Sequence, residues 1–348
     1  MAPSAAPRRL AYLNLPQGDT EELRAGIEGG SCRNRDGHQM MKIAVGEIVQ
    51  GYRITRFLGR GGFASVYLAQ HEESGNKVAL KVGASAGGGR QVTRLLEVTS
   101  RRTQEGISPD ELPAEAVFFE PVGVRIDLFD EAEVHGMLRA EGDLLAACHH
   151  ENMVNLFDRL VIDGHPVLVL EFVRGKTLRE KIRGLEGIHL NWFLAIVRAL
   201  VALKDSNALS YHGDLKPENI LVKPSGKVVM VDPGMRLVER RVVTTTPHYN
   251  PLLLCDSKAD VMAIGIMIYE ILTGTLPFDE VPWEFAGQQT GGETMRLSLS
   301  YFFSYCPPHV LNPKTPEDLE RIIYRCITVP NYGLGELRKD LEEFIGKA

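Results

Sequence analysis

Apolar and polar residues alternate through much of the first half of the chain. The stretch YRITRFLGRGGFASVYLAQ alternates around a glycine cluster, which predicts two strands joined by a glycine turn. KVALKVG predicts a third strand, and MVNLFDRLVID and HPVLVLEFV predict two more, joined by a turn at DGHP. Before these last two, MLRAEGDLLAAC predicts a helix with Leu138, Leu144 and Leu145 on one side.

The second half, after Gly175, shows mostly helical spacing. NWFLAIVRALVALKDS and ADVMAIGIMIYEILTG are long and apolar enough for buried helices. Residues 316–328 and 334–345 predict two amphipathic helices. A strand-rich half followed by a helix-rich half predicts an α+β protein with two lobes.

Two segments depart from these patterns. Residues 1–46 are rich in Gly, Pro and Arg and predict a mobile N-terminal extension, with a short helix at DTEELRAGI. Met40 or Met41 is an alternative start of translation. Residues 84–130 predict a partly structured insertion, with a weak helix at Val92 to Arg102 and a hairpin in AVFFEPVGVRI.

Composition narrows the class of protein. The formal net charge of -6 argues against a nucleic-acid binder that neutralises phosphates. The five cysteines show neither CxxC nor Cys/His ligand spacing, so neither a disulfide framework nor a zinc site is expected. There is no apolar run of membrane-spanning length, and RRLAYLNLP lacks the features of a signal peptide. A cytoplasmic protein is expected.

The glycine cluster is the first candidate for chemistry. Gly59, Gly61 and Gly62, followed by Phe63, lie at a predicted turn between strands. Glycines there let backbone N–H groups approach phosphate oxygens, although an ordinary hairpin has the same pattern. A strand rather than a helix follows, which counts against a dinucleotide-binding βαβ unit.

Lys81 lies on a predicted buried strand, where a lysine is costly unless its charge is paired. A phosphate and a carboxylate would pair it. The candidate acids are Glu131, Glu133 and Glu141, and each is also explained by a solvated helix face.

The stretch YHGDLKPENILVK places Asp214, Lys216 and Asn219 close together in one polar loop. A carboxylate can accept or orient a hydroxyl proton, an ammonium can neutralise a transferring phosphoryl group, and an amide oxygen can bind a metal. Asp232 in VVMVDPG ends a predicted strand and is suited to hold Mg²⁺.

These motifs, in this order, resemble those of bacterial serine/threonine protein kinases of the eukaryotic-like (Hanks) type. GRGGFASV resembles the glycine-rich loop, VALK the strand lysine motif, HGDLKPEN the catalytic loop, DPG the DFG motif, and SKADVMAIGIMIYEILTGTLPF the central helix of the C-lobe. The resemblance implies a bilobal kinase domain over residues 47–346. Its N-lobe, residues 47–173, would be an antiparallel sheet with one regulatory helix, and its C-lobe, residues 174–346, mainly helical.

The resemblance also implies Mg-ATP as the bound nucleotide. Gly59, Gly61, Gly62 and Phe63 would cover its phosphates. Leu170 would be the gatekeeper, and the backbone of Glu171 and Val173 would contact adenine. The ring would lie between Val66, Ala79 and Leu221.

The catalytic roles follow from the same family. Lys81 would contact the α- and β-phosphates and pair with Glu141, because HHENMVNLFD follows Glu141 at the family's distance. The other implied roles are a catalytic base at Asp214, a γ-phosphate contact at Lys216, magnesium ligands at Asn219 and Asp232, and a support for the catalytic-loop backbone at Asp260.

Three departures from the family pattern bear on regulation. Gly213 replaces the usual arginine before the catalytic aspartate, which is the pattern of a non-RD kinase. Activity is therefore expected to depend little on phosphorylation of the activation loop. Thr244 to Thr246 in that loop are candidate autophosphorylation sites. Pro233 replaces the DFG phenylalanine, which both loosens the packing and limits flipping of Asp232. In TPHYNPLLL, Leu252 or a neighbour replaces the APE glutamate, and CITVPNYGLGEL lacks its arginine partner.

An active serine/threonine kinase with protein substrates is therefore the first hypothesis. A nucleotide-binding pseudokinase that serves as a scaffold or allosteric partner is the second, and a small-molecule phosphotransferase, which can share HGD, is the third. Residues 84–130 and 283–310 are candidate surfaces for a regulatory partner.

Overall fold

The computed structural model describes most of the chain after residue 42, and the residues it describes belong to one compact unit, Met40–Ala348. The described residues are 43–60, 64–83, 91–94, 117–118, 122–129, 131–234, 236–237, 242–243, 248–251, 254–277, 279–280, 295–299, 301–303 and 306–347. The extension predicted for residues 1–46 lies almost wholly outside them. Of its last residues, Gly46 donates a backbone hydrogen bond of 2.8 Å to the Ile54 carbonyl.

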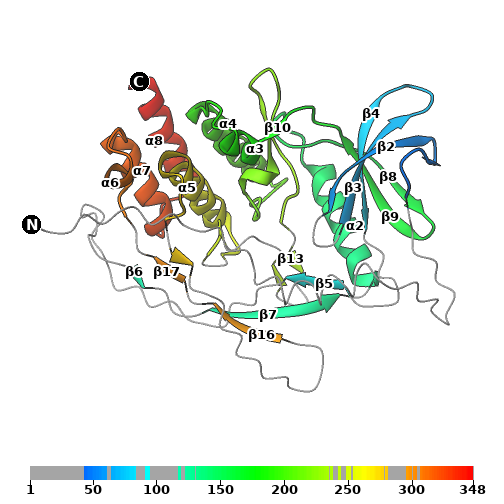
Figure 1. The fold of residues 1–348 in the computed structure, drawn as a ribbon, viewed down its shortest axis with the longest axis horizontal. Coiled ribbons are helices and arrows are strands. Elements are labelled where there is room, and N and C mark those ends of the chain that lie inside the picture. The colour runs from blue at the N-terminus through cyan, green and yellow to red at the C-terminus, as the bar shows by residue number, and fades with distance from the viewer. Residues whose placement is uncertain are drawn as a thin grey trace, which may run out of the picture. The chain divides into compact units, whose positions relative to one another are not determined.

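A six-stranded antiparallel sheet, in the order β1-β2-β3-β4-β9-β8, forms the N-lobe (Figure 1). Its strands are β1 (Ile48–Val49), β2 (Tyr52–Arg60), β3 (Ala64–His71), β4 (Lys77–Gly83), β8 (Leu156–Ile162) and β9 (His165–Glu171). Asp163 and Gly164 join β8 to β9 with φ of 51° and 85°, as a two-residue turn of the type I′ class requires. The five strands and the turn predicted from alternation are confirmed.

Helix α2 (Glu131–Ala147) packs against β4, β8 and β9. It begins earlier than predicted, because Glu131 and Glu133 in its first turn favour the positive end of a helix dipole although few apolar residues lie there. Leu138 and Leu145 are both buried, which agrees with their predicted position on one side of the helix.

Helices make up most of the C-lobe (Figure 1). They are α3 (Leu178–Arg183), α4 (Leu190–Asp205), α5 (Ser257–Thr273), α6 (Pro308–Leu311), α7 (Glu317–Thr328) and α8 (Leu334–Lys347), with a 3-10 turn, η1 (Pro217–Asn219). A small sheet of β10 (Lys176–Thr177), β11 (Ile220–Val222) and β12 (Val228–Met230) lies beside them. Within the described residues, no helix is long and apolar enough to cross a membrane.

The two faces of β4 pack into different apolar clusters. Val78, Leu80 and Val82 belong to a small cluster within the sheet, whereas Ala79 belongs to the large core that continues into the C-lobe. Because side chains alternate along a strand, Lys81 lies on the same face as Ala79. The strand therefore directs the lysine toward α2 and the C-lobe.

The described part of segment 84–130 contains three strands: β5 (Gln91–Arg94), β6 (Val117–Phe118) and β7 (Val122–Phe129). The predicted helix is wrong at its start, since Val92 pairs with Leu128 in a sheet. The predicted hairpin is also wrong, because β6 and β7 lie in different sheets.

Residues distant in sequence complete these sheets. Strand β7 pairs with β16 (Met295–Leu299), and β6 pairs with β17 (Tyr301–Phe303), which pairs in turn with β15 (Asp279–Glu280). A further short pair joins β13 (Arg236–Leu237) to β14 (Val242–Val243). The two unusual segments of the sequence, 84–130 and 283–310, thus pair with each other.

Candidate active site

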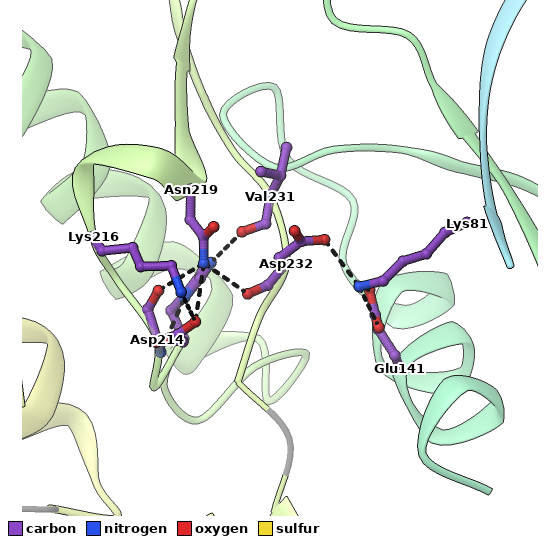
Figure 2. A network of polar contacts seen from close by, with 8 residues as sticks. Lys81, Glu141, Asp214, Lys216, Asn219, Val231 and Asp232 are labelled. Carbon is purple, nitrogen blue, oxygen red and sulfur yellow. Dashed lines mark hydrogen bonds and ion pairs between the residues drawn. The ribbon is translucent and has the colours of Figure 1, made fainter. Parts of the chain in front are cut away.

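The Lys81 ammonium lies between two carboxylates from different parts of the chain (Figure 2). Its Nζ is 2.7 Å from both carboxylate oxygens of Glu141 on α2 and 2.9 Å from Oδ1 of Asp232. The side chains of Lys81 and Glu141 are 7% and 1% exposed, and that of Asp232 is 46% exposed. Burial opposes the charge on Lys81, but Asp232 and Glu141 outweigh it and raise the pKa, so the group remains an ammonium.

Three polar residues of the catalytic loop form a second set of contacts (Figure 2). Lys216 Nζ donates to Asp214 Oδ2 at 2.8 Å, and Asn219 Nδ2 donates to the same oxygen at 3.1 Å. Asn219 Nδ2 also lies 3.4 Å from the carbonyl oxygen of Asp232. The loop and the end of strand β12 are therefore joined, and the carboxylates of Asp214 and Asp232 lie in one polar network with Lys81.

Asp232 has an unusual backbone conformation, with φ of 53°. A non-glycine residue in this left-handed region is strained and persists only where its surroundings hold it. The next two residues supply such contacts, since Pro233 is buried and the Gly234 N–H donates to the His212 carbonyl at 2.7 Å. Burial acts against ionisation of Asp232, but Lys81 and Lys216 lower its pKa below the ordinary value, so it is a carboxylate.

The backbone of the catalytic loop is held by Asp260 on α5. Its carboxylate accepts hydrogen bonds from the N–H groups of His212 at 2.7 Å and Gly213 at 2.8 Å. Burial raises the pKa of Asp260 to about 7, although these two bonds act in the opposite direction.

The ring of His212 is fully buried and joins the loop to the strand before Asp232. Burial lowers the pKa of His212 to about 4, so the ring is neutral at pH 7. Its Nε2 lies 3.1 Å from the Val231 carbonyl and therefore carries the proton, and Nδ1 lies 3.4 Å from the N–H of Asp214.

Gly213, which replaces the usual arginine, has φ of +81°. A side chain is strained in this region, and an added Cβ would lie 3.0 Å from Cε2 of Tyr211. The local backbone thus suits the glycine that the sequence places there.

The residues predicted to contact adenine lie in one apolar cluster. Ala79, Leu170 and Val173 belong to its buried core, and Val66 and Leu221 pack against it. The Glu171 side chain contacts Lys223 and Asn155, both at 2.8 Å, and its backbone N–H donates to the Asn155 carbonyl at 2.9 Å. Gly59 pairs with Val66 across the β2–β3 hairpin, whereas Gly61, Gly62 and Phe63 lie outside the described residues.

A polar network near the end of the activation segment was not expected from the sequence. Tyr249 donates to Glu270 Oε2 at 2.7 Å, and Arg179 on α3 contacts Glu270 Oε1 at 2.5 Å and also donates to the Tyr249 hydroxyl. This network joins the segment to α3, which carries Arg179, and to α5, which carries Glu270. The three residues share no motif spacing, so no pattern could have found them. Leu252 and Thr244 to Thr246 lie outside the described residues.

The stretch CITVPNYGLGEL, which lacks the family's arginine, contacts a lysine instead. Lys258 Nζ on α5 donates to the carbonyl of Cys326 at 2.9 Å and lies 3.4 Å from those of Arg325 and Tyr332. A cation at the carboxyl end of helix α7 satisfies carbonyls that have no partner within the helix.

Comparison with known proteins gives the family. A family model described as "Protein kinase domain" matches residues 128–327. The chain is 25% identical over 326 residues to "Serine/threonine-protein kinase PrkC" of Bacillus subtilis (strain 168), a match that covers 88% of this chain and 42% of that protein. It is 27% identical over 301 residues to "Probable serine/threonine-protein kinase PknB" of Lactococcus lactis subsp. lactis (strain IL1403), which covers 81% of this chain and 40% of that protein. The chain spans about two fifths of the length of these relatives.

A solved structure agrees in fold. The Mycobacterium tuberculosis PknI kinase domain superposes with a TM-score of 0.52 at 17% identity, over 87% of this chain and 99% of that chain. The resemblance to bacterial serine/threonine protein kinases is confirmed, as is the predicted bilobal α+β fold. Since the family model matches more than half of its residues, the chain belongs to the protein kinase domain family.

Proposed function

We propose that this chain is a serine/threonine protein kinase that transfers the γ-phosphoryl group of Mg-ATP to protein hydroxyls. The observation that carries the proposal is the meeting of Lys81, Glu141 and Asp232 beside the catalytic-loop network of Asp214, Lys216 and Asn219. The names of the bacterial relatives support serine and threonine as acceptors.

Binding of the nucleotide begins with the apolar cluster. Val66, Ala79 and Leu221 would enclose the adenine ring, with Leu170 behind it and the backbone of Glu171 and Val173 at its edge. Lys81, fixed by Glu141, would donate to the α- and β-phosphates, and the glycine-rich turn at Gly59, Gly61, Gly62 and Phe63 would cover them.

The oxygen donors near the catalytic loop fit magnesium. The Asp232 carboxylate is ionised and 46% exposed, and Asn219 donates through Nδ2, so its Oδ1 is the atom it would offer to a cation. A hard cation such as Mg²⁺ takes oxygen ligands of this kind. When bound, it would neutralise charge on the phosphates.

Asp214 and Lys216 would act on the reacting groups. The Asp214 carboxylate, held by Lys216 and Asn219, would orient the acceptor hydroxyl and take its proton. Lys216 would place positive charge beside the transferring group. Because the transition state is loose, positioning and charge contribute more than strong basicity.

The departures from the family pattern support the assignment of a non-RD kinase with atypical DPG and APE regions. Gly213 gives no guanidinium to bind a phosphorylated activation loop, and Pro233 restricts the backbone next to strained Asp232. The contacts of Tyr249 with Arg179 and Glu270 would support the substrate-docking segment in place of the missing APE glutamate.

The proposed function also includes a regulatory partner and a cellular location. A regulatory partner would contact residues 84–130 or 283–310, which pair with each other as strands. Their pairing gives such a partner one combined surface rather than two. The net charge of -6 does not favour nucleic acid as a partner. The cysteine spacing supports a reducing, cytoplasmic location.

Transfer of labelled γ-phosphate to a generic protein substrate tests the proposal. The wild-type chain is expected to label serine and threonine residues when Mg²⁺ is present, and Asp214→Asn is expected to abolish labelling. Nucleotide binding without transfer to any protein would refute the proposal and favour a scaffold. Phosphorylation of sugars, amino alcohols or antibiotics in place of proteins would favour a small-molecule kinase.

A further inference from the structure

Helix α2 and strand β9 bring together two histidines and a carboxylate away from the catalytic loop. Glu131 and His135 lie one turn apart on α2, and His165 is the first residue of β9. His135 Nε2 lies 3.0 Å from His165 Nδ1, and Glu131 Oε1 lies 3.8 Å from the former and 3.5 Å from the latter. Three potential ligand atoms thus form a small triangle.

The size of this triangle suits one metal ion. Zinc bonds to nitrogen and oxygen are roughly 2.0–2.2 Å long, which places tetrahedral ligand atoms roughly 3.3–3.6 Å apart. Of the three observed separations, 3.5 Å lies within that range, 3.0 Å lies below it and 3.8 Å lies above it. Shifts of a few tenths of an ångström would therefore bring all three atoms into coordination.

The donors also have the right chemistry. The residues His135 and His165 are 8% and 6% exposed, and the Glu131 side chain is 43% exposed. An imidazole can bind a metal through either ring nitrogen, and the facing nitrogens of these two rings are 3.0 Å apart. Two imidazoles and one carboxylate are a donor set for Zn²⁺, and the exposed carboxylate leaves an approach from solvent.

We propose that Glu131, His135 and His165 form a binding site for a divalent transition metal of the zinc class, with a fourth position open to water. Coordination by two imidazoles that each carry one N–H proton releases no net proton. The proton shared between Nε2 of His135 and Nδ1 of His165 moves to the far nitrogen of its own ring, and both facing nitrogens then donate to the metal.

The site would join the first turns of α2 to the sheet. His165 follows the turn between β8 and β9, and the His135 ring lies near the end of β4, with Cδ2 3.4 Å from the position of a Cβ on Gly83. Glu141, the partner of Lys81, lies further along the same helix. A metal here would therefore fix the start of the helix that positions Lys81, independently of any nucleotide.

Zinc titration of the metal-stripped full chain, in competition with a chromogenic zinc indicator, tests the site. One equivalent is expected to bind. Glu131→Gln and His165→Ala are each expected to weaken binding by at least about 10-fold. Glu133→Gln on the same helix and His309→Gln, which alters another His–Glu pair, are matched controls expected to bind like the parent.

The contradicting results are equally specific. Absence of a one-equivalent zinc site in the parent would overturn the proposal. Unchanged affinity in Glu131→Gln would overturn it too, and this partly exposed position is expected to tolerate glutamine even if His165→Ala fails to fold. Loss of zinc binding in Asp232→Asn, with Glu131→Gln unaffected, would assign the metal to the catalytic loop instead. None of these measurements depends on kinase activity.

Discussion

Helix α2 holds the same kind of acid in opposite circumstances at two positions, its first residue Glu131 and, further along, Glu141. Glu141 is buried and lies 2.7 Å from an ammonium, whereas Glu131 is partly exposed and faces two imidazoles at 3.8 and 3.5 Å. The Glu141 carboxylate is paired with a cation of the chain itself, the Lys81 ammonium. The Glu131 carboxylate instead faces two imidazoles around a point that a metal ion would fill.

The difference separates two kinds of coupling between α2 and the sheet. At Glu141 the link to β4 is an ion pair within the chain, and its lysine is shared with Asp232. At Glu131 the link to β9 would depend on a metal taken from solution. One helix would thus carry one contact formed within the chain, which the proposed function uses in catalysis, and a second contact that depends on a metal and adjusts the stability of the helix.

The largest expected effect is the loss of catalysis when Glu141 is replaced. Glu141→Gln removes the charge that fixes Lys81, so kcat/KM for protein phosphorylation is expected to fall by about 10³-fold. Zinc affinity of the same variant should equal that of the parent. A Glu141→Gln variant whose kcat/KM stays within about threefold of the parent value would show that Glu141 and Glu131 do not differ in this way.

Acid pH is expected to lower stability through the buried histidines. The folded-state pKa of His212 is about 4, below its ordinary value of 6.5, so protons bind the unfolded chain first as pH falls. Stability is present in full above pH 6.5 and is lost between 6.5 and about 4, by about 3 kcal/mol from this residue.

Denaturant unfolding at several pH values, with chelator present, measures this loss. His135, whose pKa is also lowered, contributes in the same direction, so His135→Gln should show a shallower dependence than the parent. Burial raises the pKa of Asp260 to about 7, so that carboxyl stabilises the folded chain as pH falls and acts against the histidines over the same range. The histidine contribution is therefore the difference between the variant and the parent, and an identical pH dependence in the two proteins would contradict it.

Zinc is expected to stabilise the chain through the Glu131 end. A ligand at 100 times its Kd adds about 2.7 kcal/mol to the folded state if it does not bind the unfolded chain. Thermal unfolding with and without zinc should show this gain in the parent and in Glu133→Gln, and much less of it in Glu131→Gln. Equal gains in all three proteins would place the metal elsewhere.

A smaller effect is expected at Gly213. Gly213→Ala places a side chain at φ of +81°, beside Tyr211, and is expected to lower the free energy of unfolding by about 1 kcal/mol. Denaturant titration measures the change, and Gly136→Ala on the exposed side of α2, where an added Cβ meets nothing within 4 Å, is the matched control. A neutral Gly213→Ala would contradict the strain.

The smallest effect is expected in the activation loop. Combined replacement of Thr244, Thr245 and Thr246 by alanine should change kcat/KM by less than about threefold, because Gly213 provides no guanidinium to bind a phosphate there. Initial rates with the wild-type chain as reference measure it. Near-total loss of activity would show that loop phosphorylation is required.

Local patterns explain which parts of the fold the sequence predicts. Alternation identifies β2, β3, β4, β8 and β9, and long apolar runs identify α4 and α5, because each signal lies within one element. Strands β5 to β7 pair partly with residues after 278, and neither their partners nor their register is written in their own sequence. The predicted helix is therefore wrong at Val92 to Arg94, and the predicted hairpin is wrong because β6 and β7 lie in different sheets.

The residues of the candidate site also differ in how far local sequence patterns predict them. Asp214, Lys216 and Asn219 share one motif and were found directly. The choice of Glu141 over Glu131 and Glu133 needed the family's spacing, and the structure places Glu141 beside Lys81. His135 and His165 are 30 positions apart and meet only because the β8–β9 turn and α2 packing bring them together. No spacing rule for metal ligands could have joined them.

Mass spectrometry of the full chain after incubation with Mg-ATP and a generic protein tests the central claim most directly, because it reports transfer and the modified residues together. The account predicts phosphorylated serine or threonine with the parent and none with Asp214→Asn. Nucleotide binding by both proteins without any phosphorylated residue would contradict it.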